Sequence, residues 1–161
     1  MQRQSLRRRG VFVVVAVMAA MLLALWAGGV STAAPSAHAA RHTLKLSGTA
    51  YMHLTRKNGN VIYEKGTATG TLPGTVTARF VTSIAKVTGT VTFRPYSGGS
   101  LTLSAIAYPS SAATVTKFTG NVAVRKGTGR FRHALGSGTC SGTANRRTWA
   151  VTVHAKARIT Y

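Results

Sequence analysis

The chain of 161 residues contains no aspartate and a single glutamate, Glu64, against 21 lysines and arginines. This shortage of carboxyl groups excludes several kinds of catalytic and metal site. Glycoside hydrolases use a pair of carboxyl groups, the Ser-His-Asp triad needs an aspartate behind its histidine, and calcium and magnesium are held mainly by carboxylate oxygens. The sequence therefore predicts no cofactor and no metal site of these types.

Cysteine is equally scarce, because Cys140 is the only one and no disulfide can form within the chain. The fold must then be held by burial and strand pairing. We expect Cys140 to be a small buried filler, since free cysteine packs as a small hydrophobe. The histidines, among them His53 and His154, lack the spacing of zinc ligands and are expected to be solvated.

The first 39 residues have the composition of a helical secretory signal peptide. Its positive start is formed by Arg3, Arg7, Arg8 and Arg9. An apolar run over residues 11–27 follows, and small residues at Ala37 and Ala39 suit cleavage before Ala40. We expect a signal peptide over residues 1–39, one mature domain over residues 40–161, and secretion. The alternative is an uncleaved N-terminal membrane anchor, because the apolar run is slightly long for a signal.

The positive charge belongs to the mature domain. Four of the 21 basic residues precede residue 40, so 17 remain there against Glu64 alone. Such a field attracts polyanions in a salt-dependent way. The densest basic groups, and the predicted polyanion-binding residues, are Arg125, Lys126, Arg130, Arg132, Arg146 and Arg147. We expect an anionic polymer or membrane surface as partner. No dedicated nucleic-acid partner is expected, because the known motifs and an aromatic stacking platform are missing.

Alternating apolar and polar residues predict β-strands throughout the mature domain. In the first segment one face carries Leu44, Leu46, Ala50, Met52 and Leu54. Similar segments follow at residues 61–72, 76–84, 87–93, 101–107 and 118–124, in a glycine-rich stretch before Asn145, and at 149–159. Ile84 and Trp149 are expected on the apolar faces of their strands. Turns are predicted at residues 57–60, 72–74, 95–99 and 126–129.

Short, evenly spaced strands with tight turns indicate an antiparallel sandwich or barrel. Glycines favour the barrel, since they fall mostly on apolar faces, where a closing sheet needs to bend. These are Gly48, Gly66, Gly70, Gly89, Gly120, Gly136, Gly138 and Gly142. The predicted fold class is all-β, a single antiparallel eight-stranded β-barrel. An interior of that size holds side chains or one small ligand.

The stretch from Gly127 to Phe131, followed by Ala134, Gly136, Gly138 and Gly142, resembles the C-terminal half of the allene oxide cyclase and dirigent barrel-like proteins. Small secreted bacterial members resemble it most. Their final alternating strand ends in an aromatic residue, as this chain does at Tyr161, and residues 91–100 look like their central hairpin. The resemblance covers residues 87–161 well and 43–86 only by strand pattern, and it implies an eight-stranded antiparallel barrel.

The activity of the characterised plant relatives is not implied for this chain. Those proteins guide cyclisation or radical coupling inside the barrel with acidic side chains among others, and a dirigent-type aspartate is missing here. Fold similarity alone does not transfer function.

Glu64 is the only candidate for acid–base chemistry. The alternation of its strand places it on the inward face, where desolvation would raise the pKa of its carboxyl group. The alternative is a position near a strand end or bulge, paired with Lys65 or another cation.

The sequence is compatible with two functions. The first is a secreted, non-enzymatic cationic barrel that associates with anionic envelope or matrix polymers and holds a small apolar ligand. The second is a cyclase-like or dirigent-like barrel that acts on a hydrophobic small molecule. Two rows of outward threonines, residues 67, 69 and 71 and residues 88, 90 and 92, either form a hydroxyl array that accepts sugars or reflect the preference of threonine for exposed strands.

Overall fold

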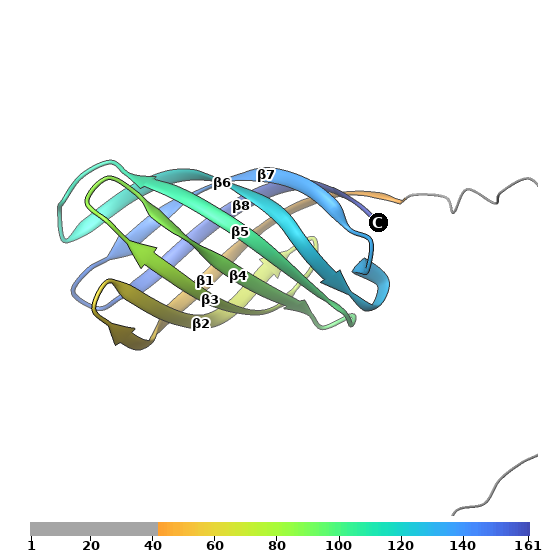
Figure 1. The fold of residues 1–161 in the computed structure, drawn as a ribbon, viewed down its shortest axis with the longest axis horizontal. Coiled ribbons are helices and arrows are strands. Elements are labelled where there is room, and N and C mark those ends of the chain that lie inside the picture. The colour runs from red at the N-terminus through yellow and green to blue at the C-terminus, as the bar shows by residue number, and fades with distance from the viewer. Residues whose placement is uncertain (1–41) are drawn as a thin grey trace, which may run out of the picture. The chain divides into compact units, whose positions relative to one another are not determined.

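The computed structural model describes residues 42–161, which form one closed barrel of antiparallel strands (Figure 1). The strands are β1 (Thr43–Asn58), β2 (Val61–Gly70), β3 (Gly74–Thr82), β4 (Val87–Pro95), β5 (Ser100–Pro109), β6 (Val115–Thr128), β7 (Leu135–Asn145) and β8 (Ala150–Thr160). They follow one another round the barrel in chain order, and β8 pairs with β1. The predicted all-β, eight-stranded antiparallel barrel is confirmed. The predicted signal peptide lies outside the described residues.

The strand register brings the apolar faces of neighbouring strands together inside the barrel. Leu54 lies opposite Glu64, Glu64 opposite Ala78, and Ala78 opposite Val91. Side chains alternate between the two faces of a strand, so one ring of paired residues is inward and the next is outward. The inward faces predicted for strands β1, β4, β5 and β6 agree with this register.

Three local predictions were wrong, each at the end of a strand. Ile84 lies in the β3–β4 loop and is fully exposed, because β3 stops at Thr82. Trp149 lines the cavity, as the apolar face of its predicted strand implies, but it lies outside that strand: β8 begins at Ala150, and Trp149 has a φ of 56°. The turn expected at residues 126–129 is displaced because β6 gains an extra residue at Arg125, where the register with β5 shifts. Such a bulge lets the strand continue to Thr128.

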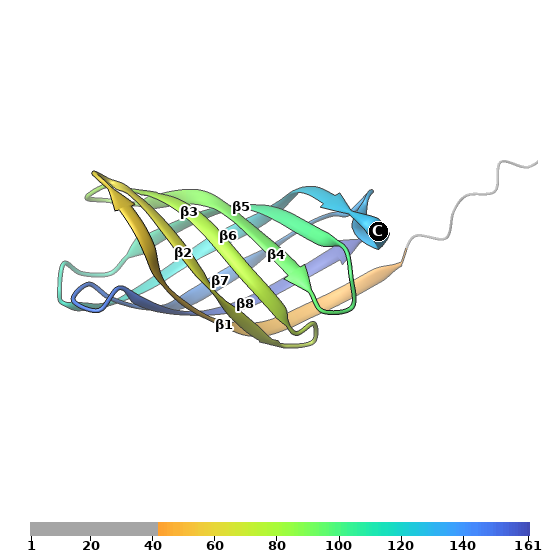
Figure 2. The same ribbon diagram turned by 90° about the horizontal axis from the view of Figure 1, so that it is seen from below.

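The two ends of the barrel differ. At one end, the short 3₁₀ turn η1 (Gly129–Phe131) between β6 and β7 carries Phe131 into the interior, where its side chain is fully buried. Phe131 packs against Leu101 and Ile159 and meets the Tyr161 ring edge to face, with centroids 5.1 Å apart. We call this the plugged end, and it lies beside the C-terminus (Figures 1 and 2). The opposite end, the mouth, is formed by the β1–β2, β3–β4, β5–β6 and β7–β8 loops.

Inward glycines allow the close approach of neighbouring strands. A Cβ atom on Gly66 would collide with the backbone of Tyr51 in β1, and one on Gly120 with the backbone of Ile106 in β5. Any side chain at these positions would push the strands apart. The glycine pattern in the sequence therefore reports a real geometric requirement of the curved sheet.

Candidate functional site

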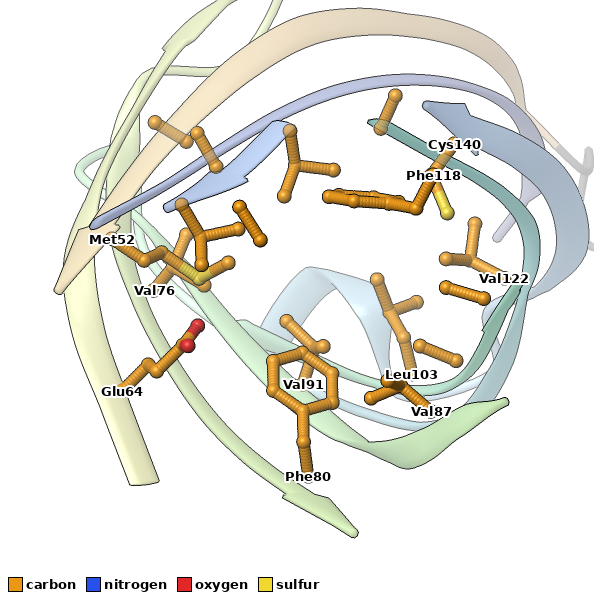
Figure 3. Close-up of a pocket in the computed structure, with 18 of the residues that line it drawn as sticks. Met52, Glu64, Val76, Phe80, Val87, Val91, Leu103, Phe118, Val122 and Cys140 are labelled. Carbon is orange, nitrogen blue, oxygen red and sulfur yellow. The ribbon is translucent and has the colours of Figure 1, made fainter. Parts of the chain in front are cut away.

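The barrel encloses a cavity of about 620 Å³. Its wall is almost entirely apolar, and side chains from all eight strands contribute to it. Figure 3 shows ten labelled lining residues arranged around an open interior: Met52, Glu64, Val76, Phe80, Val87, Val91, Leu103, Phe118, Val122 and Cys140. Cavities of this volume with apolar walls are typical of small-molecule sites.

Small inward side chains explain why the interior is hollow. A partial ring of paired positions, over six of the eight strands, carries no side chain larger than cysteine. Its members are Gly70, Gly48, Ala155, Cys140, Gly120 and Ala107. The larger side chains at neighbouring levels line the space without filling it. Half-exposed interior residues such as Leu103 and Val151 are the result.

Glu64 is the only charged side chain in the cavity wall outside the mouth. It is 2% exposed and lies in the middle of β2, between Leu54 of β1 and Ala78 of β3. Its carboxyl group is turned into the cavity (Figure 3). A bulge in β1 directly after Leu54 leaves Thr55 outside, where its hydroxyl donates to the carbonyl of Tyr63 at 3.0 Å. The bulge adjusts the pairing of β1 beside Glu64 without turning the carboxyl group outward.

Among residues 42–161, Glu64 does not form the pair with Lys65 or another cation that was the alternative prediction. Lys65 is exposed on the outer face, as alternation along β2 requires. The buried Oε2 atom of Glu64 has no hydrogen-bond partner among residues 42–161. Desolvation raises the pKa of this carboxyl group from 4.5 to about 7. The group therefore changes protonation state near neutral pH.

The mouth is the polar part of the cavity. Its lining includes Ser83 from the β3–β4 loop, Asn145 at the end of β7, and Arg146 and Trp149 from the β7–β8 loop. The side chain of Asn145 accepts hydrogen bonds from the backbone amides of Arg147 and Thr148 at 2.9 and 3.2 Å, which fixes the loop that carries Arg146. Sequence reasoning missed Trp149 as a mouth residue, because the alternation of β8 placed it inside the strand.

The residues predicted to bind polyanions do not form one patch. Arg125 and Lys126 lie near the end of β6, Arg130 lies in η1, and Arg132 follows it, so these four occupy the plugged end. Arg146 and Arg147 lie in the β7–β8 loop at the mouth. All six are exposed. Arg130 donates to Ser97, and Arg125 donates to the hydroxyl of Ser104 at 3.0 Å.

The remaining candidates have simple surroundings. Cys140 is buried in the cavity wall, as expected for a packing residue, and burial raises the pKa of its thiol. A thiol held protonated is a poor nucleophile. Within residues 42–161, no three histidine, cysteine or acidic side chains lie close enough to hold a metal ion. In the same range, no helix is long and apolar enough to cross a bilayer.

Five chains of solved structures match this closed eight-stranded barrel, among them two pterocarpan synthase dirigent proteins. The pterocarpan synthase dirigent protein GePTS1 aligns with a TM-score of 0.54 and 16% identity over 84% of this chain and 99% of that chain. The pterocarpan synthase dirigent protein PsPTS1 aligns with a TM-score of 0.54 and 13% identity over 73% and 94%. No protein-family model matches the sequence, and no curated protein matches it either.

These matches confirm the resemblance to dirigent barrels that the sequence predicted from its glycine pattern. At 16% and 13% identity they establish the fold. The function of this chain has to be argued from its own site.

Proposed function

We propose that this protein binds a small apolar molecule inside its barrel, with the carboxyl group of Glu64 as the single polar contact. The observation that carries the proposal is a 2% exposed carboxyl group that faces an apolar cavity of about 620 Å³ and whose Oε2 has no hydrogen-bond partner among residues 42–161. Burying an unsatisfied polar group costs free energy. A ligand with one complementary polar group would satisfy Glu64 and fill the cavity at once.

The chemistry of Glu64 limits the ligand class. With its pKa raised to about 7, the carboxyl group is largely protonated below neutral pH, and a protonated carboxyl both donates and accepts a hydrogen bond. The preferred ligand is therefore a mainly hydrocarbon molecule that carries a hydroxyl or carbonyl group. The rest of the wall beyond the mouth is almost entirely apolar.

A pair of model ligands tests this assignment at pH 6. We expect 1-naphthol to bind the protein roughly tenfold more tightly than naphthalene, the value of one buried hydrogen bond. Glu64→Leu should remove the preference while keeping affinity for naphthalene. The matched control, Glu64→Gln, retains hydrogen-bonding atoms and should keep most of the preference for 1-naphthol over naphthalene. Equal affinities for both compounds in the wild-type protein would contradict the role of Glu64.

A second candidate function is turnover of the bound molecule, and one observation favours it. A carboxyl group with a pKa of about 7 suits general acid–base catalysis at neutral pH. In that case Glu64 would protonate or deprotonate a cyclising ligand. A ligand extracted from the protein should then be converted by the wild type and bound without conversion by Glu64→Gln. Conversion by the Glu64→Gln variant would exclude this function and leave the binding role intact.

We also propose that the exported domain associates with anionic polymers or surfaces through its outer cations. The support is the charge balance of residues 40–161, which contain 17 basic residues and one glutamate, whose side chain points inward. Secretion with cleavage between Ala39 and Ala40 places such polymers within reach. The mass of the mature protein from its host tests the cleavage site, since an intact N-terminus would indicate the anchored form instead.

A further inference from the structure

The outer surface of the barrel carries a groove that the cavity proposal does not use. It crosses six adjacent strands, from β2 through β1, β8, β7 and β6 to β5. One wall is a row of residues that the strand register places side by side: Thr69, Thr49, His154, Ser141, Thr119 and Tyr108. The opposite wall is the next outward row, and the groove includes its members Ser47, Lys156, Thr139 and Asn121.

The same small residues that hollow the interior also shape this groove. The ring with Gly48, Gly120 and Cys140 lies between the two outer rows and forms the floor of the groove. Strands that lack inward side chains bend toward the barrel axis. With strands about 4.8 Å apart, five steps between strands give the groove a length of roughly 24 Å along the sheet. That length suits an extended chain rather than a compact molecule.

The groove presents polar atoms that are free to contact a ligand. The side chains of Thr119, Asn121, Thr139 and Ser141 form no hydrogen bond to another described residue, and all four are exposed. The hydroxyl of Thr49 lies 2.9 Å from Nδ1 of His154, which leaves Nε2 of the imidazole available. Hydroxyl, amide and imidazole groups both donate and accept hydrogen bonds, as sugar hydroxyl groups do. Tyr108 adds a half-exposed aromatic ring at one end.

Charge argues for an anionic occupant and against a second copy of the chain. Lys156 lines the groove, and among residues 42–161 the only carboxylate side chain, Glu64, faces inward. Two copies that met through this face would bring their Lys156 side chains into one interface without a countercharge. Phosphate backbones are typically held by arrays of lysine and arginine, whereas Lys156 is the single such residue in this groove.

We propose that this groove binds an extended acidic polysaccharide, whose hydroxyl groups contact the two polar rows and whose carboxylate groups contact Lys156. The proposal rests on the attraction of anionic polymers proposed above and adds to it a defined site and a chemical class of partner. Binding in the groove would depend on uncharged residues as well as on cations, whereas a purely electrostatic attraction would depend on the cations alone.

The test measures affinity for polygalacturonate at physiological salt with variants that keep the net charge. Thr119→Ala combined with Asn121→Ala should weaken binding roughly tenfold or more, because two sets of hydrogen bonds to the polymer are lost. The matched control is Thr75→Ala with Thr90→Ala, two outward threonines on β3 and β4 outside the groove, which should change affinity less than twofold. Both pairs are surface changes in strands, and thermal unfolding verifies that each variant folds.

Polyphosphate and single-stranded DNA serve as comparison polyanions. Tighter binding of polygalacturonate than of both, with loss confined to the groove variant, would support the site. Equal binding of all three polymers with no effect of the groove variant would overturn it, while general polyanion attraction would stand. Absence of binding to any polyanion would overturn both proposals. Self-association that the groove variant abolishes would also overturn the site and indicate an interface between copies.

Discussion

At the scale of single residues, Glu64 is the side chain on which the proposed function depends. The chain has one acidic side chain, and the barrel places it in an apolar interior with no partner for Oε2 among residues 42–161. An isolated buried carboxyl group destabilises a protein unless it is protonated or satisfied. Its position in an otherwise apolar wall is the reason to propose a functional role for it.

The buried position of Glu64 predicts an unusual pH dependence of stability. Its pKa is about 7 in the folded protein and near 4.5 when exposed. Between these values the folded state binds more protons than the unfolded state, so the free energy of unfolding falls as pH rises. The loss begins near pH 4.5, is complete slightly above pH 7, and amounts to something on the order of 3 kcal/mol.

Urea unfolding of the wild type and of Glu64→Gln at pH 5, 6, 7 and 8 measures this effect. The stability difference between the two proteins isolates Glu64 from other titrating groups. It should be small at pH 5 and should favour Glu64→Gln at pH 8. A wild type that becomes more stable than the variant as pH rises would mean that the carboxylate is paired, contrary to the structure.

The direction of the Glu64 side chain could be predicted from the sequence, whereas its neighbours in the barrel could not. The alternation of Ile62, Gly66 and Ala68 with outward neighbours already gave its inward direction. Whether a cation reached it was decided by the register with β1 and β3, which places Leu54 and Ala78 on either side. Register depends on contacts between distant segments, so no local pattern contains it.

At the scale of elements, the 3₁₀ turn η1 closes the plugged end through one side chain. Phe131 is fully buried and contacts Leu101, Ile159 and Tyr161. In the sequence, Phe131 belongs to the motif that carries the family resemblance. The sequence pattern predicted only a turn at residues 126–129 and no buried side chain at Phe131. Phe131 is buried from within a 3₁₀ turn, and a two-residue alternation cannot represent a residue in such a turn.

Phe131→Ala should lower the free energy of unfolding by about 3–5 kcal/mol, the usual range for a buried phenylalanine. Phe80→Ala is the matched control, since Phe80 borders the cavity and is only half buried. It should cost less, because part of its ring already faces open space. Chemical denaturation measures both, and equal losses would show that Phe131 does not act as a plug.

At the scale of the whole molecule, the fold was largely predictable and the cavity was not. Alternation and glycine placement gave a closed barrel of eight strands, because both are local signals of a bent antiparallel sheet. The interior volume depends on the sizes of the side chains that occupy paired inward positions on neighbouring strands. The coincidence of Gly48, Cys140 and Gly120 at one level appears only once the strands are in register.

The charge of the whole molecule predicts salt-dependent binding to anionic polymers. The logarithm of affinity should fall linearly with the logarithm of salt concentration. Because Arg125 and Lys126 lie at the plugged end and Arg146 and Arg147 at the mouth, neutralising each pair with glutamine should reduce the slope independently. Binding titrations at several salt concentrations measure this. A slope unchanged in both variants would show that these cations do not contact the polymer.

Native mass spectrometry of protein recovered from its own host shows whether the barrel holds a small molecule. We expect additional mass on the native protein that is lost on denaturation. Ala105→Phe, which fills the cavity from β5, should remove that mass, whereas Thr90→Phe, on the outer face of β4, should keep it. Bare protein in the wild type and in both variants would mean that the cavity holds no ligand.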